Sequence, residues 1–578
     1  MKNTLFVIVL ATITLLWTLP AGASPQNYHN SAGDQLRSWL QPYCREAMSP
    51  GKDLKNDALL QIARFYDRRG YEPVWADPHG LLPHGAEVLE TLRQYAAEGE
   101  PGLSDHLDNF EKMLDDGLRL VASGLSMPPE DFARLDVRFT QIVMHYVVSL
   151  RYHYWTPFEG GKSAEDRLFR QLADALEAEL LDDLLAASQP QHIQYRALRS
   201  SLKQYETIKL LGGWPQIKAG PKMRLGRRDG RVPVLRWRLV ISGDMTLDQL
   251  SAEEIFDAVL TEAVRKFQRR HGLKVDGVVG KRTRAMLNVP VEDRILQLKA
   301  NIERWWRMPI DLGTRYLMVN IPNYQLHIVE NNTVVKSIRA IVGKQDRRTP
   351  VFSTKMTYLE LNPYWNVPQK IASRDLLPRI QNNPQFLIRQ RIQVFKNWNA
   401  GARELDPLAV DWNRYSKENF NLRLRQKPAR FNALGLVKFI FPNRYSVYIH
   451  DTPGKALFRK RKRSYSSGCI RIEEPFALAE YLLKDQQWDR SELLRRVRTN
   501  KRKVIALKSP IPVHLVYFTS WIDDAGTTHF REDLYGRDHR LSEEMARGTP
   551  AFETANLIPL QDNLMASINQ MLARDLSM

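Results

Sequence analysis

One of the two cysteines in this 578-residue sequence, Cys469, lies in a segment whose residue types could support nucleophilic chemistry. The segment reads VYIHDTPGKALFRKRKRSYSSGCIRIEEP over residues 447–475, and His450 precedes the cysteine by nineteen positions. A thiol attacks a carbonyl carbon as its thiolate, and a neighbouring imidazole or positive field makes that form accessible at neutral pH. Two interpretations follow: a structural thiol near a histidine, or the nucleophile and base of an acyl-transfer enzyme.

A strand expected over residues 445–450 would position the histidine. Alternation along that strand places Tyr448 and His450 on one face and the apolar side chains between them on the other. A turn follows directly, so either the carboxylate of Asp451 or a backbone carbonyl could orient the imidazole. This position at the end of a strand favours a base over a packing residue.

Small residues precede the cysteine, in the order Ser466, Ser467 and Gly468. They would let a substrate carbonyl approach the backbone, where the amides of Gly468 and Cys469 could form an oxyanion hole. Arg471 lies two residues further on, and strand alternation puts it on the same side as the cysteine. It could therefore bind a carboxylate or lower the pKa of the thiol.

The elements that must hold these residues are expected to be mostly β. From Leu317 onward apolar and polar residues alternate, and Asn331-Asn332 turns the chain between two strands. We expect residues 315–507 to form a compact sandwich or barrel that carries the catalytic residues. Residues 370–430 interrupt this pattern with helical and loop-like sequence, and an insertion of this size predicts a lid over the site.

The rest of the chain carries no motif with chemistry. We expect residues 24–250 to form a mainly helical scaffold domain, residues 291–314 a connecting helix, and residues 508–578 an extension that packs on the scaffold or the catalytic domain. Cys44, the other cysteine, is interpreted as a semi-buried helical thiol. A disulfide between Cys44 and Cys469 would remove the nucleophile, and we expect none because the two lie in different domains.

Residues 251–290 have the pattern of a helical hairpin. One helix is predicted from an apolar stripe spaced four residues apart, formed by Ile255, Val259, Ala263 and Phe267. Gly272 ends that helix, and Asp276-Gly277 turns the chain toward a second one.

Residues 1–23 have the pattern of a signal peptide, with Lys2, an apolar run and small residues before Ser24. The run is shorter than the ~20 residues that span a membrane, and an uncleaved inner-membrane anchor is the alternative. Export changes the meaning of the net charge of +19. Outside the cytoplasm the anionic partners are cell wall and membrane surface, so nucleic acid is disfavoured and membrane contact is peripheral at most. The dense basic run at 459–463 is interpreted as a solvated loop.

The segment around Cys469 resembles the active-site signature of the YkuD-type L,D-transpeptidases, in which a His precedes Ser or Thr, His-Gly-Cys, a hydrophobic residue and Asn or Arg. Here Ser467 stands in place of the second His and Arg471 in place of Asn, a form associated with the large Gram-negative branch. The segments LNPYWNVPQKI and RQKPARFNALGLVKFIFPNRYSVYIHDTP resemble that branch as well. AVRKFQRRHGLKVDGVVGKRTRAML is similar to the small three-helix peptidoglycan-binding module.

The resemblance implies an α+β multidomain protein: a helical scaffold, a small three-helix wall-binding module and a mostly-β YkuD-type catalytic domain with an inserted lid. Cys469 would attack the carbonyl at the L-centre of meso-diaminopimelate in a tetrapeptide stem and expel D-Ala, while His450 moves the proton. The amide of Gly468 would stabilise the oxyanion. The amine of a second stem would take the acyl group, giving a 3→3 cross-link without metal or other cofactor.

The resemblance also implies contacts with the substrate from Arg471, Tyr448, Trp365 and Ser467. Trp365 could equally be a packing residue in its Pro-flanked turn. The implied partners are peptidoglycan stem peptides and glycan, with other cell-wall synthases as potential partners. The implied location is the periplasm, and carbapenems are the expected inhibitors.

Several alternatives stay open. Water in place of the amine would make the enzyme an L,D-carboxypeptidase, and a lysine of an envelope protein would make it a protein-to-peptidoglycan attachment enzyme. A wall-binding scaffold with a vestigial Cys-His pair is a different class, as is a nucleic-acid-binding protein, which rests on basicity alone.

Overall fold

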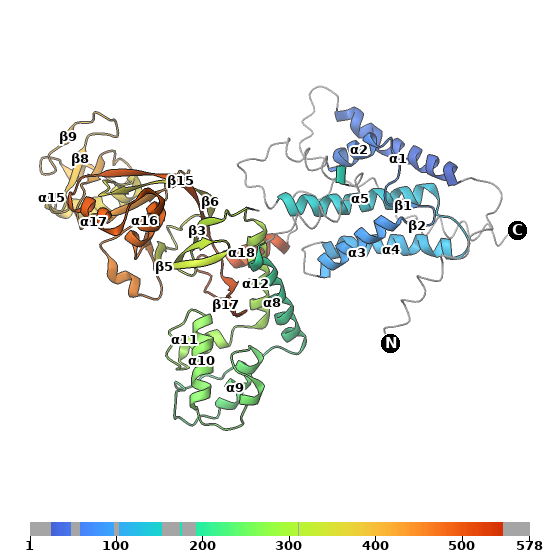
Figure 1. Cartoon of the computed structure of the whole chain (residues 1–578), viewed down its shortest axis with the longest axis horizontal. Coiled ribbons are helices and arrows are strands. Elements are labelled where there is room, and N and C mark those ends of the chain that lie inside the picture. Colours follow the sequence, from blue (N-terminus) through green and yellow to red (C-terminus); the bar gives the residue numbers. More distant parts are fainter. Residues whose placement is uncertain are drawn as a thin grey trace. The chain divides into compact units, whose positions relative to one another are not determined.

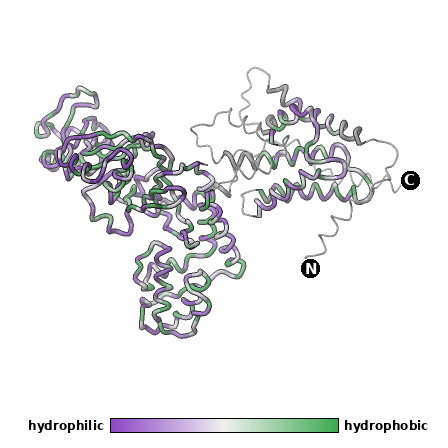
Figure 2. Tube along the Cα trace, in the orientation of Figure 1, coloured by the Kyte–Doolittle hydropathy of each residue, from purple (hydrophilic) through white to green (hydrophobic). Residues whose placement is uncertain are grey.

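The structure, a computed structural model, describes residues 25–47, 58–97, 103–152, 174–175, 192–309 and 311–546. These residues fall into two compact units that divide near residue 190 (Figure 1). In both units apolar and polar residues alternate along the elements (Figure 2). The expected signal peptide at 1–23 lies outside the described residues, and no helix within them is long and apolar enough to cross a membrane.

The first unit is helical, as expected. Its elements are α1 (Pro25–Ala47), α2 (Ala58–Arg68), the short strands β1 (Ala76–Asp77) and β2 (Gly80–Leu81), α3 (Pro83–Ala97), α4 (Leu103–Ala122) and α5 (Pro129–Tyr152). Asp136 on α5 anchors the segment before β1, because its buried carboxylate accepts hydrogen bonds from the amides of Val74 at 2.9 Å and Ala76 at 3.0 Å. These bonds offset the cost of burying the carboxylate, whose pKa burial raises.

A second group of helices opens the second unit. It comprises α8 (Ile193–Leu210), α9 (Val232–Ile241), α10 (Ala258–Arg270), α11 (Lys281–Leu287) and α12 (Val291–Trp306). Helices α9, α10 and α11 share one apolar core that extends from Ile217 to Leu287 (Figure 1). The expected boundary at residue 251 is therefore corrected, because it cuts through this core. Likewise, the part of the expected scaffold domain from 190 to 250 belongs to the second unit, where α8 packs on α12.

The N-cap of α10 determines which of the predicted apolar residues lie within the helix. Asp257 accepts a hydrogen bond from the amide of Leu260 at 2.8 Å, so the helix begins at Ala258. Ile255 lies before the helix and is exposed, as is Val259. Ala263 and Phe267 of the predicted stripe are buried, and Leu260 and Val264 beside them complete the buried face.

The catalytic region forms a closed sheet. Its strands are β3 (Arg315–Asn320), β4 (Gln325–Glu330), β5 (Thr333–Gly343), β6 (Phe352–Leu361), β11 (Val437–Ile440), β12 (Ile449–His450), β13 (Ser464–Ser466), β14 (Ile470–Ile472) and β15 (Lys503–Val516). They follow the order β13-β5-β14-β12-β11-β6-β15-β3-β4, and β4 also pairs with β5. This extra pairing closes the sheet, so the barrel alternative is the one observed. The core of the barrel includes α16 (Pro475–Leu483) and α17 (Arg490–Arg498).

The expected insertion at 370–430 folds as a subdomain with an apolar core of its own. Its elements are β7 (Trp365–Asn366), α13 (Gln369–Ile371), a π-helix (Ala372–Leu376), α14 (Leu377–Asn382), α15 (Gln385–Arg389), β8 (Ile392–Phe395), β9 (Glu404–Leu405) and β10 (Arg423–Gln426). The strands form a separate sheet in the order β7-β10-β8-β9. A separate core means that this segment is a folded subdomain rather than a loop without structure.

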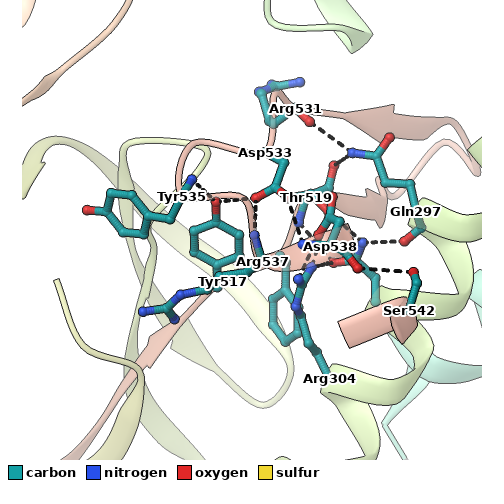
Figure 3. Close-up of polar contacts among 12 residues, drawn as sticks. Gln297, Arg304, Tyr517, Thr519, Arg531, Asp533, Tyr535, Arg537, Asp538 and Ser542 are labelled. Atoms are coloured by element: carbon teal, nitrogen blue, oxygen red, sulfur yellow. Dashed lines mark hydrogen bonds and ion pairs between the residues drawn. The ribbon is translucent and has the colours of Figure 1, made fainter. Parts of the chain in front are cut away.

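The expected boundary at residue 507 is corrected, because it falls inside β15, which pairs with β6 on one side and with β3 on the other. After β15 come β16 (Ser520–Ile522), β17 (Thr528–Phe530) and α18 (Arg537–Ala546). Figure 3 shows how this extension is tied to the end of β15: the hydroxyl of Tyr517 donates to Asp533 and accepts from the amide of Tyr535, both at 2.6 Å. The described part of the extension therefore packs on the catalytic domain.

The side chain of Gln268 on α10 allows a test of the core shared by α9, α10 and α11. Its buried side-chain amide donates to the carbonyl of Val278 at 3.0 Å and accepts from the amide of Gly277 at 2.8 Å. Gln268→Leu leaves the amide of Gly277 without its partner, whereas the carbonyl of Val278 keeps the amide of Gly280 at 3.1 Å. We therefore expect hydrogen exchange of residues 258–287 to report a loss of about 1 to 3 kcal/mol of local stability. The exposed Gln345→Leu variant serves as the control. Unchanged protection in Gln268→Leu would contradict this account.

Candidate active site

Four neighbouring strands of the barrel hold a row of polar side chains in register. Glu360 on β6 pairs with Lys438 on β11. Lys438 pairs in turn with His450 on β12, and His450 pairs with Arg471 on β14. Residues paired across neighbouring strands share one face of a sheet. The row therefore brings together side chains that are up to 111 positions apart in the sequence.

Cys469 lies directly before β14, two positions from Arg471, and so faces the same side as the row. The amide of Ile470 donates to the carbonyl of Tyr448 at 3.1 Å, which ties the cysteine to the strand of the histidine. Cys469 is a free, partly buried thiol. The structure thus brings four of the predicted site residues to one face of the sheet: Tyr448, His450, Cys469 and Arg471.

Hydrogen bonds fix the loop around the cysteine. The hydroxyl of Ser466 donates to the carbonyl of Cys469 at 2.6 Å and accepts from the amide of Gly468 at 3.1 Å. Gly468 has a φ of +118°, a conformation that residues with side chains rarely adopt. Its amide, expected as an oxyanion donor, is thus engaged by Ser466 in this arrangement.

The C-terminal extension braces this loop, a role that sequence reasoning missed. The hydroxyl of Tyr535 donates to the carbonyl of Gly343 at 2.7 Å and accepts from the amide of Thr349 at 3.2 Å. The hydroxyl of Thr349 in turn donates to the carbonyl of Gly468 at 2.8 Å. A segment after the barrel therefore supports Gly468, the residue next to Cys469.

The sulfur lies in a polar but buried environment. Both the backbone amide and the hydroxyl of Tyr448 contact it, and the Tyr448 and His450 ring centroids are 5.6 Å apart. Burial raises the pKa of the Cys469 thiol above its ordinary value. The contacts with Tyr448 and the positive charges of Lys438 and Arg471 oppose that rise.

His450 is buried and neutral. Its Nδ1–H donates to the backbone carbonyl of Asp451, so Nε2 is the nitrogen that can accept a proton. Burial, reinforced by the charge of Arg471, lowers its pKa to about 3. Of the two orienting groups considered above, the carbonyl is the one observed. The Asp451 carboxylate instead accepts from the amide of Leu436 at 2.9 Å and from Nζ of Lys455 at 2.6 Å.

No hydrogen bond joins the sulfur of Cys469 to the imidazole of His450 in the described part of the chain. Catalytic hydrogen bonds often shorten only when substrate binds, so the shared face is the informative feature. Among the described residues, no group of three or more His, Cys, Asp or Glu side chains could hold a metal ion.

Ser467 and Trp365 lie in other surroundings than expected. The hydroxyl of Ser467, expected to contact substrate, accepts a hydrogen bond from Arg347 at 3.0 Å. Arg347 also forms two bonds with the carboxylate of Asp375 in the insertion, one of them at 2.7 Å. Trp365 packs against the core of the insertion, as its alternative interpretation had it.

The basic run at 459–463 is not simply a solvated loop. Lys462 and Arg461 pair with Glu532 at 2.6 and 3.6 Å. Arg463 donates to the carbonyls of Tyr324 at 2.9 Å and Ala340 at 3.1 Å. These cations hold the loop against the barrel and the C-terminal extension.

Sequence reasoning also missed Lys438. It stands between the apolar residues Val437 and Phe439 of a strand, both fully buried. A charged residue that alternates with buried apolar ones was the signal that could have identified the polar face of β11. Its pairing with His450 could not be read from that signal.

Comparison with known families assigns three regions of the chain. Residues 314–505 match YkuD, described as an L,D-transpeptidase catalytic domain. Residues 228–287 match a family described as "Putative peptidoglycan binding domain", and residues 60–202 match a scaffold domain.

Individual relatives cover less of the chain. The chain is 33% identical over 226 residues to "Putative L,D-transpeptidase" of Haemophilus influenzae, a match that spans 39% of this chain and 45% of that protein. It is 40% identical over 76 residues to N-acetylmuramoyl-L-alanine amidase CwlM of Mycobacterium tuberculosis, covering 12% of this chain and 19% of the relative. The chain thus spans less than half the length of these curated relatives.

A search of solved structures found an L,D-transpeptidase from Xylanimonas cellulosilytica, covering 52% of this chain and 99% of that one. The identity is 16% and the TM-score 0.16, too low to carry an argument. The family match over residues 314–505 and the relative from Haemophilus are both described as L,D-transpeptidases. This chain carries a YkuD-family L,D-transpeptidase catalytic domain together with a peptidoglycan-binding domain.

Proposed function

We propose that this protein forms 3→3 cross-links between meso-diaminopimelate residues of peptidoglycan stems through a thioester on Cys469. The observation that carries the proposal is the face shared by a free cysteine with Tyr448, His450 and Arg471 inside the matched catalytic domain. The peptidoglycan-binding domain in the same chain supports peptidoglycan as the substrate.

In the first half-reaction, the sulfur of Cys469 attacks the carbonyl carbon between meso-diaminopimelate and terminal D-Ala. The thiol proton passes to Nε2 of His450, which burial keeps neutral and able to accept it. When the C–N bond breaks, the same proton goes to the leaving amine of D-Ala, and a thioester remains. In the second half-reaction, the amine of an acceptor stem attacks the thioester, the C–S bond breaks, and one amine proton returns through His450 to the sulfur.

The oxyanion of each tetrahedral intermediate needs hydrogen-bond donors. The amide of Gly468 can serve when the hydroxyl of Ser466, its present partner, gives way. The hydroxyl of Tyr448 contacts the sulfur already and is a second donor close to the reacting carbon. Tyr448 therefore has a stronger case for this role than its expected part in substrate binding alone.

Arg471 suits a carboxylate of the donor stem. Its guanidinium forms no ion pair with any described residue, and its Nε is buried without a hydrogen-bond partner. A substrate carboxylate would satisfy both the charge and the donor. Because Arg471 shares a register position with His450, the bound carboxylate would lie next to the reacting centre.

The insertion supports transfer to an amine rather than to water. Arg347 joins Asp375 of the insertion to Ser467, two residues before the nucleophile. An insertion held against this loop limits the access of water to a thioester. The L,D-carboxypeptidase and protein-attachment alternatives use the same acyl-enzyme and differ in the acceptor.

We also infer a periplasmic location from the expected signal peptide. From the family we infer that carbapenems acylate the protein.

A test of the reaction compares the products of purified full-length protein and its Cys469→Ala variant. With tetrapeptide muropeptides, we expect the wild type to give 3→3 dimers and free D-Ala, and the variant to give neither, a loss of at least a thousandfold. Chromatography with mass spectrometry of the muropeptides measures both products. Tripeptides without dimers would support the carboxypeptidase instead, and dimers from the variant would contradict the mechanism.

The pH dependence follows from the low pKa of His450. The imidazole becomes charged only below about pH 3, so the base form persists as pH falls through 6.5, the ordinary value for histidine. We expect the rate of carbapenem acylation, followed by intact mass, to have no break near pH 6.5 between pH 5 and 8. A break near 6.5 that disappears in His450→Gln would contradict a buried neutral base.

The bridge through Arg347 predicts control of the acceptor. Asp375→Asn removes the charge that holds Arg347 near Ser467, so we expect the ratio of hydrolysed tripeptide to 3→3 dimer to rise several-fold. The control is Glu418→Gln, an exposed carboxylate of the same insertion. An unchanged ratio in Asp375→Asn would show that this contact does not limit water.

A further inference from the structure

Lys438 is a cation in the active-site row that the reaction described above does not use. It lies on β11 between Glu360 and His450 in register, and its sequence neighbours Val437 and Phe439 point into the barrel core. The lysine therefore points to the opposite face, where Cys469 lies.

Lys438 contacts the aromatic ring beside Cys469 and forms no ion pair among the described residues. Its Nζ lies 4.1 Å from the centroid of the Tyr448 ring, a cation–π contact. No carboxylate of the described residues lies within 4.0 Å of it. Glu360, its neighbour in register, is instead bound by Arg502 through two hydrogen bonds of 2.7 and 3.2 Å.

Tyr448 connects this cation to the sulfur. The ring that receives Lys438 belongs to the residue whose amide and hydroxyl contact Cys469. Burial lowers the pKa of Lys438, and the negative charges of Glu360 and Cys469 oppose that shift. The charge of Lys438 in turn opposes the rise that burial causes in the pKa of Cys469. His450 is neutral before the reaction, so the positive charge already present near the sulfur comes from Lys438 and Arg471.

We propose that Lys438 is a positioning residue of this active site, whose ammonium holds the Tyr448 ring in place and supplies the positive charge that favours the thiolate of Cys469. The proposal rests on the proposed function in one respect, that Cys469 is the nucleophile. A purely structural lysine would be replaceable by methionine, which fills the same space, with no effect on the reactivity of the sulfur.

Other charged and titratable groups contribute to the same field and must be kept constant. Glu360 lies on β6, His450 on β12 and Arg471 on β14. Tyr448, Cys469 and Arg502 lie just before β12, β14 and β15. The test therefore changes Lys438 alone. Lys438→Met removes the charge, and Lys438→Arg keeps it.

The experiment alkylates Cys469 in the full chain with two probes, neutral iodoacetamide and anionic iodoacetate, and follows the adduct by intact mass across a pH series. We expect Lys438→Met to slow iodoacetamide about tenfold at neutral pH and to move the midpoint of its pH profile upward, because the thiolate loses a neighbouring charge. The reaction with iodoacetate should slow by a larger factor, so the ratio of the iodoacetate rate to the iodoacetamide rate should fall. Lys438→Arg should retain both values to within a few-fold.

The matched control is Lys355→Met, an exposed lysine on β6 of the same sheet, which should leave both rates unchanged. Peptide mapping assigns each adduct to Cys469, and thermal melting checks that each variant is folded. If Lys438→Met melts early, Lys438→Gln replaces it. The proposal is overturned if a folded variant without the charge at position 438 alkylates at wild-type rates with an unchanged ratio of the two rates. It is also overturned if Lys438→Arg reacts as slowly as Lys438→Met. Alkylation needs no peptidoglycan, so failure of the cross-linking reaction gives a distinct result.

Discussion

The parallel pairing of β12 with β14 is the constraint on which the active site depends. It sets His450 beside Arg471 and, through the hydrogen bond from Ile470 to Tyr448, sets the cysteine beside the tyrosine. Because side chains alternate along a strand, a slip of one residue would turn the nucleophile to the opposite face. The loop before β14 is correspondingly well fixed, with Gly468 in a conformation that suits glycine and bonds from Ser466 and Thr349 on either side.

Burial gives this site its chemical character. A neutral imidazole and a buried thiol carry no charge separation before the reaction. In the proposed reaction, the proton therefore moves as the substrate carbonyl is attacked. Arg471 and Lys438 nevertheless place positive charge near Cys469, and neither forms an ion pair with a described residue. Such an arrangement suits a reaction in which negative charge develops first on sulfur and then on oxygen.

Local rules predicted much of the frame. Asn331 and Asn332 both have positive φ in the hairpin turn where the sequence placed it, and Gly272 ends α10 with a φ of +62°. The motif around Cys469 indicated the family that residues 314–505 match, and Cys469 and His450, the proposed catalytic pair, lie on one face of the sheet. The partners of these residues could not be predicted, because Lys438 meets His450 only once distant strands pair, and the carbonyl that binds the imidazole depends on the turn after β12. Domain boundaries failed for the same reason, since shared cores and the continuity of β15 are tertiary properties.

The central claim is that Cys469 carries the acyl group of a peptidoglycan stem. It is tested most directly by the intact mass of the full-length protein, quenched with acid within seconds of mixing with a tetrapeptide muropeptide and no acceptor. The account predicts a mass increase equal to the donor minus D-Ala, located on Cys469 by peptide mapping and removed by neutral hydroxylamine, as for a thioester. A protein that releases D-Ala without this adduct, or an adduct that persists in Cys469→Ala, would contradict it.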